Sequence, residues 1–124
     1  MQKPLIYGLV LLSLLLCVDP TAATGETLQF AIDGHSMEPT LEDGQVVLVQ
    51  NISAVAPLEI DQIYVYKPTW KSYTGNGWMH RLYWIFYVGD EVYYIFKGDH
   101  NDYFDVPAKR WQIMYQLKEK APWV

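Results

Sequence analysis

Six short segments rich in β-branched and aromatic residues recur along the chain after residue 27. They are LQFAI (28–32), QVVLVQ (45–50), QIYVY (62–66), HRLYWIFYV (80–88), EVYYIF (91–96) and WQIMYQL (111–117). The turn signals between them are Asp43-Gly44, Gly75-Asn76-Gly77, Gly89-Asp90 and Gly98-Asp99. No segment past residue 25 combines a 3.6-residue hydrophobic period with helix caps. The pattern predicts an all-β fold, a small and strongly bent sheet or barrel, with a tight hairpin at Val88-Gly89-Asp90-Glu91.

Length and composition indicate one folded domain. The chain has 124 residues, and single domains usually have roughly 100–200. Apolar residues make up 51% of it, which is enough for a packed core. The net charge of -5 and the absence of a Lys/Arg cluster argue against a nucleic-acid partner. Cys17 is the only cysteine, which excludes an internal disulfide and a cysteine-based zinc site.

The N-terminal segment differs from the rest of the chain. Lys3 is the only charged residue before Asp19, and the stretch between them is almost entirely apolar. A helix over residues 4–18 would be about 22 Å long at roughly 1.5 Å per residue, whereas a spanning helix usually needs about 20 residues. We expect residues 1–24 to be a membrane anchor (or a cleaved signal peptide). Lys3 favours a cytoplasmic N-terminus, with residues 25–124 as an extracytoplasmic all-β domain.

The segment GHSMEPTLEDG (34–44) places Ser36 in a turn, where its hydroxyl needs a neighbouring base to become a nucleophile. The candidate bases are His35, His80, His100, Lys67, Lys71 and Lys97. Neighbours in an extended chain point to opposite faces, so we expect His35 at the surface. His80 opens a strongly apolar strand, where a lone histidine is often a core residue. His100 lies in the acidic loop KGDHNDYFD (97–105), whose spacing does not match a calcium-binding loop.

Four segments, taken together and in this order, resemble the signal peptidase I family. They are GHSMEPTLEDG (34–44), EIDQIYVYKP (59–68), MHRLYWI (79–85) and KGDHNDYFD (97–105). In that family a Ser-Met-x-Pro-Thr turn carries the nucleophile, a base–Arg pair opens a later strand, and a Gly-Asp-x-Asn loop precedes a second Asp. Bacterial members have lysine as the base, whereas archaeal and endoplasmic-reticulum members have histidine. In this sequence the residue before Arg81 is His80. The resemblance spans residues 28 to about 106.

The resemblance implies a membrane-bound serine endopeptidase that removes signal peptides, with Ser36 as nucleophile and His80 as general base. Imidazole titrates near neutrality, so a histidine accepts a proton without prior desolvation. Asp99 and Asp105 are the candidates for the acid that orients His80. The sequence leaves open which one does so, although the family favours Asp105, and the other would pair with Arg81 or brace the loop. Many members have a serine where Gly34 stands, so backbone N–H groups would hold the oxyanion.

The expected partners are preproteins that carry signal peptides, and the membrane, while translocon or other complex partners stay open. No cofactor and no metal are expected. The substrate would bind as an extended strand along a sheet edge such as residues 28–32. A self-cleaving repressor-type protease shares the Ser-Met turn, but it carries a DNA-binding domain and uses lysine. A secreted, non-catalytic all-β binding module is the other alternative, and it would leave the four ordered motifs as coincidence.

Overall fold

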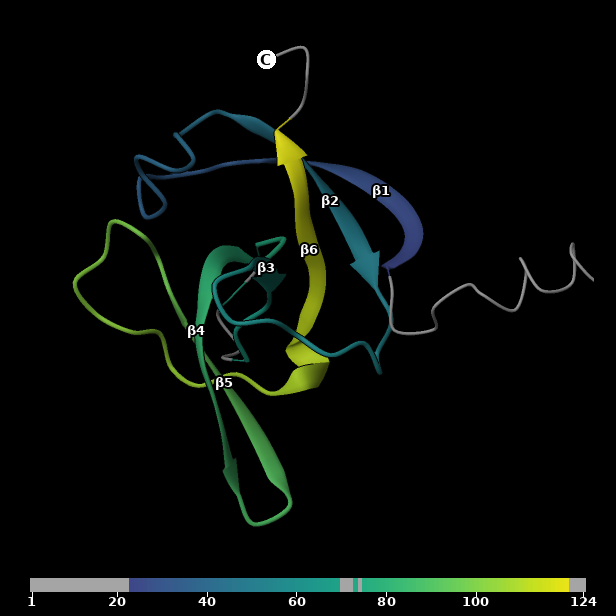
Figure 1. The fold of residues 1–124 in the computed structure, drawn as a ribbon. Coiled ribbons are helices and arrows are strands. Elements are labelled where there is room, and N and C mark those ends of the chain that lie inside the picture. Colours follow the sequence, from purple (N-terminus) through teal and green to yellow (C-terminus); the bar gives the residue numbers. More distant parts are fainter. Residues whose placement is uncertain (1–22, 70–72, 74, 121–124) are drawn as a thin grey trace, which may run out of the picture.

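The protein, seen in a computed structural model that describes residues 23–69, 73 and 75–120, is an antiparallel six-stranded sheet. Its strands are β1 (Ala23–Ala31), β2 (Val46–Ile52), β3 (Ile63–Tyr66), β4 (Trp78–Val88), β5 (Glu91–Lys97) and β6 (Ile113–Lys120). The strand order is β1-β2-β6-β3-β4-β5, and a short 3-10 helix, η1 (Arg110–Gln112), precedes β6 (Figure 1). The predicted all-β fold is confirmed, and each of the six predicted segments contributes a strand.

Several strand ends differ from the predicted segments, most clearly the starts of β1 and β6. β1 begins at Ala23, because Ala23 pairs with Ile52 of β2, with a register shift between Ala23 and Thr27. β6 begins two residues later than expected, because the side chain of Gln112 replaces ladder contacts. It accepts a hydrogen bond from the Lys109 N–H at 2.8 Å and donates one to the Lys67 carbonyl at 2.8 Å, which holds η1 out of the strand.

The hairpin between β4 and β5 has the predicted two-residue turn. Val88 pairs with Glu91, and Gly89 has φ = +60° at the first central position, as a type II′ turn requires. Figure 1 shows this hairpin projecting away from the rest of the sheet. The turn therefore sets the register of the β4–β5 pairing from Val88 back to Trp84, where a register shift interrupts it.

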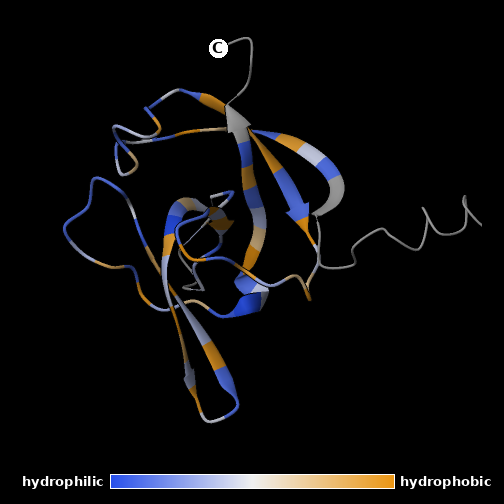
Figure 2. Ribbon diagram, in the orientation of Figure 1, coloured by the Kyte–Doolittle hydropathy of each residue, from blue (hydrophilic) through white to orange (hydrophobic). Residues whose placement is uncertain are grey.

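Strand β3 lies between β6 and β4, and both of its faces are buried. Ile63 and Val65 pack into one hydrophobic cluster, and Tyr64 and Tyr66 pack into a second. A strand buried on both faces is a continuous apolar run, whereas hydrophobic and hydrophilic segments alternate along strands such as β6 (Figure 2). Tyr64 is paired with His80 across the ladder, so this rigid strand sets the position of the start of β4.

The predicted membrane anchor, residues 1–24, lies outside the described residues except for its last two. The expected boundary between residues 24 and 25 falls within β1. In the part of the chain that the structure describes, no helix is long and apolar enough to cross a bilayer.

Candidate active site

The loop between β1 and β2 carries Ser36 and is closed at its base by hydrogen bonds. The Ile32 N–H donates to the Gln45 carbonyl and the Gly44 N–H to the Ile32 carbonyl, both at 2.8 Å. Within the loop, the Gly34 N–H donates to Asp43 Oδ1 at 2.8 Å. Gly34 has φ = +101° and Gly44 φ = +81°, values that favour glycine. The buried side chains of Met37 and Leu41 anchor the turn in the core. Ser36 is therefore presented from a fixed backbone.

The side chains of Ser36, His80 and Asp105 form one continuous hydrogen-bonded chain. Ser36 Oγ lies 3.0 Å from His80 Nε2, and His80 Nδ1 lies 2.5 Å from Asp105 Oδ2. His80 is only 7% exposed and Asp105 only 9%. In the tautomer that donates from Nδ1 to the Asp105 carboxylate, Nε2 presents its lone pair to the serine hydroxyl. This is the relation of nucleophile, base and orienting acid in a catalytic triad.

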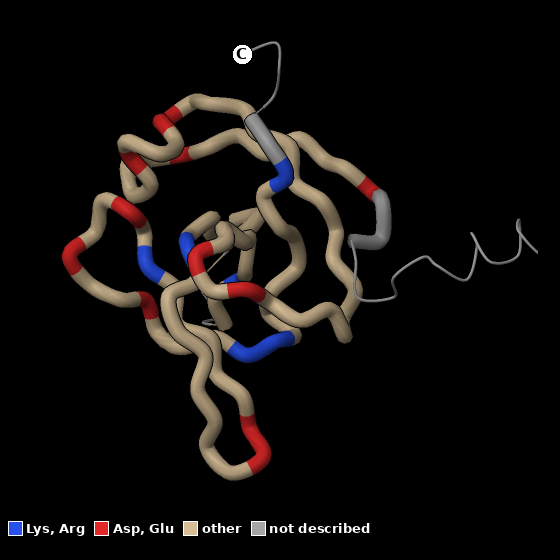
Figure 3. The backbone as a smooth tube through the Cα atoms, in the orientation of Figure 1, with Lys and Arg blue, Asp and Glu red and all other residues tan. Residues whose placement is uncertain are grey.

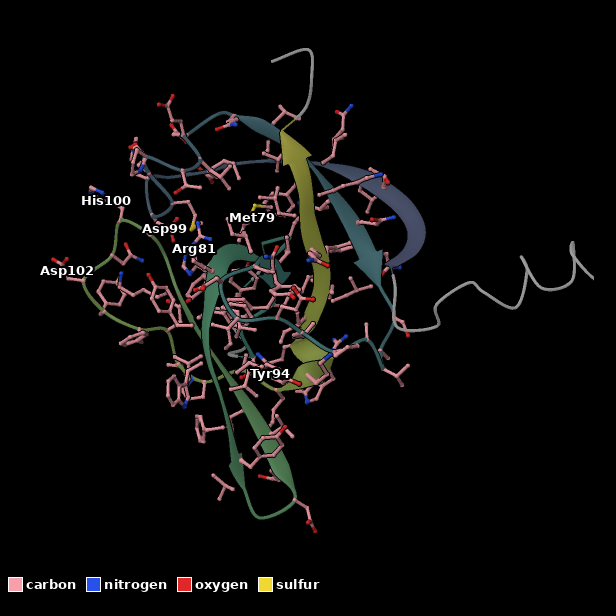
Figure 4. All side chains as sticks on the ribbon, viewed as in Figure 1. Met79, Arg81, Tyr94, Asp99, His100 and Asp102 are labelled. Atoms are coloured by element: carbon pink, nitrogen blue, oxygen red, sulfur yellow. The ribbon has the colours of Figure 1, made fainter. Side chains whose placement is uncertain are left out.

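Asp99 contacts Arg81 and not His80. Arg81 donates from Nε to Asp99 Oδ1 at 2.9 Å and from Nη2 to Asp99 Oδ2 at 2.8 Å, and Thr40 Oγ1 donates to Oδ2 at 2.6 Å. Figure 4 shows Arg81 and Asp99 side by side. Arg81 Nη1 also donates to the Asp61 carbonyl at 2.6 Å. The two acids that the sequence left open thus have separate positions, with Asp105 on the imidazole and Asp99 in a clamp that ties the Ser36 loop to β4.

The clamp between Arg81 and Asp99 makes the folding stability depend on pH. Hydrogen bonds from Arg81 hold the pKa of Asp99 below its usual value of 3.8, and the Thr40 hydroxyl adds to this effect. A lowered folded-state pKa contributes stability above the usual pKa, and this contribution is lost as the pH falls through the lowered value. We expect Asp99→Asn to unfold at a lower urea concentration than wild type at pH 7, with the gap closing below about pH 4. Urea titrations from pH 2 to 7 measure this, and a gap independent of pH would contradict it.

The loop after β5 braces Ser36 from the other side. The His100 N–H donates to the Ser36 carbonyl at 2.8 Å, and the Asn101 N–H donates to the Gly98 carbonyl at 3.0 Å. A Cβ added to Gly98 would lie 2.6 Å from the Ser36 carbonyl oxygen and 3.0 Å from Ser36 Cβ. The backbone contact leaves room for glycine alone at this position.

Gly98→Ala is therefore expected to push the Ser36 turn away from His80 and to cost about 1–3 kcal/mol of stability, the usual range for overpacking. Urea unfolding measures the stability, and the backbone amide shifts of residues 36 and 100 report the displaced turn. Asp102→Ala is the control, because Asp102 projects outward from the same loop (Figure 4). Equal stability and unchanged amide shifts in Gly98→Ala would show that the contact is not tight.

Three of the other candidate bases, His35, His100 and Lys97, have contacts that do not involve the Ser36 hydroxyl. His35 is exposed, as expected, and a hydrogen bond with Glu38 at 2.9 Å raises its pKa. The side chain of His100 is exposed (Figure 4). Among the hydrogen bonds of the described residues, His100 contacts Ser36 only through its backbone N–H. Lys97 lies over the ring of Tyr83. Among the described residues, no group of three or more His, Cys, Asp or Glu could hold a metal ion. Lys71 lies outside the described residues.

A cleft of about 660 Å³ opens beside the Ser–His–Asp chain, and Ser36, His80 and Asp105 all line it. One wall is formed by residues 29–33, at the end of β1 and just after it. β1 pairs with β2 along one side only, so in the described sheet its other edge is open. The opposite wall includes residues 77–79, and the ladder between β4 and β5 begins only at Arg81. The cleft therefore lies beside the open edge of β1, which can accept an extended chain.

Tyr66 also contacts the site, although the sequence indicated only a core strand there. Its hydroxyl donates to Asp105 Oδ2 at 2.5 Å, and its ring stacks on Phe96 with centroids 4.5 Å apart. Burial raises the pKa of Tyr66, and the hydrogen bond to Asp105 raises it further, so the hydroxyl keeps its proton. A tyrosine in a strand buried on both faces needs a polar partner for its hydroxyl. The apolar run around Tyr66 is therefore the sequence feature that could have indicated this contact.

The sequence matches no model of a known protein family, and no curated protein matches it. A functional assignment therefore rests on the site itself. The site combines an oriented serine, a buried imidazole and a carboxylate with an open cleft. In the described part of the chain the Ser36 N–H donates to no protein acceptor, so it is available to an oxyanion. Together these groups have the chemistry of acyl transfer.

Proposed function

We propose that the protein is a membrane-bound serine endopeptidase of the signal peptidase I type, which removes N-terminal signal peptides from exported proteins. The observation that carries the proposal is the hydrogen-bonded chain of Ser36, His80 and Asp105 on the wall of a cleft with a free strand edge. The four ordered sequence motifs support the same reaction, because their residues supply this chain and the loops that brace it.

In the proposed mechanism, Ser36 Oγ attacks the scissile carbonyl while His80 Nε2 takes the hydroxyl proton. Asp105 stabilises the resulting imidazolium through Nδ1. The Ser36 N–H stabilises the developing oxyanion, since Gly34 has no hydroxyl to contribute. The imidazolium then gives its proton to the leaving amine, and the peptide bond breaks to leave an ester on Ser36. A water molecule, deprotonated by His80, hydrolyses the ester and restores the serine.

The substrate binds in the cleft as an extended strand. Residues 29–33 offer the open edge of β1 for main-chain hydrogen bonds, which bind any sequence, and the side-chain pockets provide selectivity. Acidic residues are prominent on the loops at 33–43 and 99–105, which flank the site (Figure 3). This charge disfavours acidic segments around the cut, and the family resemblance adds a preference for small residues before it.

The anchor places the site at the membrane. Residues 1–24 hold the protein with its N-terminus in the cytoplasm, and the catalytic domain lies on the extracytoplasmic face. Ala23 opens β1, which leads directly into the wall of the cleft, so the anchor and the substrate-binding strand are nearly contiguous in sequence. Membrane fractionation with N-terminal sequencing tests this placement. A soluble mature chain that starts near Thr24 would contradict it.

The deciding experiment incubates the purified full-length protein with a preprotein in detergent and identifies the products by mass spectrometry. One cut, after a small residue at the end of the signal peptide, is expected. A preprotein with a bulky residue at that position should remain uncut, and so should the mature protein without its signal peptide. An intact preprotein would reject the peptidase. Binding without cleavage would instead support an all-β binding module.

A further inference from the structure

Asp105 Oδ2 accepts hydrogen bonds from two side chains on adjacent strands. His80 Nδ1 of β4 and the Tyr66 hydroxyl of β3 each lie 2.5 Å from this single oxygen. In the described part of the chain, these are the titratable groups that hydrogen-bond to the carboxylate. The backbone of Asp105 is fixed as well, because its N–H donates to the Phe96 carbonyl at 2.8 Å.

Tyr66 is held rigidly in this position. It is 2% exposed, its ring stacks on Phe96, and it contacts the ring of His80 edge-on with centroids 6.4 Å apart. A side-chain carboxylate turns readily about its last torsion, and a single donor does not define which oxygen faces the imidazole. The second donor, fixed from the opposite strand, selects the orientation in which Oδ2 faces His80.

We propose that Tyr66 is a positioning residue for the reaction, one that fixes Asp105 Oδ2 toward His80. This inference rests on the proposed function. The hydroxyl dipole stabilises the carboxylate before the reaction begins. The carboxylate is then already oriented when the imidazolium forms, so little reorganisation accompanies proton transfer.

The test compares Tyr66→Phe with a matched control on the same strand. Tyr64 is 1% exposed, and its hydroxyl accepts the Glu59 N–H at 2.9 Å, away from Asp105. Tyr64→Phe thus deletes an equally buried hydroxyl without touching the carboxylate. Both variants keep their rings, so each retains the packing against Phe96.

With a preprotein substrate, Tyr66→Phe is expected to lower kcat about tenfold to a hundredfold, the rate equivalent of one hydrogen bond to a charged group. KM should stay nearly constant. The acid limb of the kcat/KM profile should move to higher pH, because a carboxylate with one donor fewer stabilises the imidazolium more strongly. Tyr64→Phe should keep kcat within about twofold and leave the acid limb unmoved, as expected for a hydroxyl outside the reacting network. Equal losses in both variants, or a wild-type profile in Tyr66→Phe, would overturn the proposal.

A double mutant and a spectroscopic measurement separate this inference from the proposed function. In an Asp105→Asn background, Tyr66→Phe should cause no further loss of kcat, because the tyrosine acts through the carboxylate. The proton resonance of His80 Nδ1–H should shift in Tyr66→Phe and not in Tyr64→Phe. If the protein cleaves no preprotein but Tyr66→Phe shifts this resonance, the proposed function is refuted and the positioning role of Tyr66 stands. An unmoved resonance would refute the positioning in an active or an inactive protein.

Discussion

Ser36→Ala is expected to reduce preprotein cleavage to the background rate while the protein stays folded. The substitution removes the attacking oxygen, and a serine protease with a catalytic triad has lost on the order of 10⁶ in kcat when its nucleophile was removed. The fold should persist because the turn is held by backbone bonds and by Met37 and Leu41, none of which involves the serine hydroxyl. Cleavage kinetics and thermal unfolding of the same samples measure the two effects.

Ser53→Ala is the control for this substitution, because it removes a serine hydroxyl from the loop after β2. That hydroxyl accepts the Val55 N–H at 3.3 Å and lies outside the cleft lining. Ser53→Ala should cleave at the wild-type rate. Substantial cleavage by Ser36→Ala would rule out Ser36 as the nucleophile.

The sequence was sufficient to predict the strands, because their local patterns agree with the fold. IYVY lacks alternation and is the strand buried on both faces. The Gly89-Asp90 turn gives its hairpin the expected register. The starts of β1 and β6, which differ from the prediction, depend on nonlocal contacts, namely the edge pairing of Ala23 with Ile52 and the bond of Gln112 to the Lys67 carbonyl. A local pattern carries no information about such contacts.

The candidate site was only partly accessible from the sequence. The order of the motifs indicated Ser36 and His80, and in the structure Ser36 Oγ lies 3.0 Å from His80 Nε2. Which acid faces the imidazole depends on the path of the loop between Asp99 and Asp105, and spacing alone does not define that path. The contact between Tyr66 and Asp105 joins residues 39 positions apart. It depends on the pairing of β3 with β4 and of β4 with β5, because Asp105 is held by Phe96 of β5.

His80→Ala is expected to abolish nearly all turnover, because neither His35 nor His100 can replace the lost base. General-base catalysis alone contributes about 10²–10⁴-fold, and loss of a triad histidine has cost about 10⁶-fold in kcat elsewhere. His80→Gln, which is closer in size, should be equally inactive while it keeps a donor for Asp105. Thermal unfolding of both variants separates loss of catalysis from loss of fold.

The histidine and lysine variants make this assignment specific. His35→Ala and His100→Asn change exposed side chains and should retain most of the activity. His80→Lys should rescue little, because a lysine acts as a base only when its surroundings lower its pKa. In this site the carboxylate of Asp105 would instead favour the charged ammonium and keep it protonated. If His80→Ala were active and either His35→Ala or His100→Asn inactive, the histidine changed in the inactive variant would be the base. Strong activity in His80→Lys would show that the cleft itself desolvates a lysine enough to make it a base.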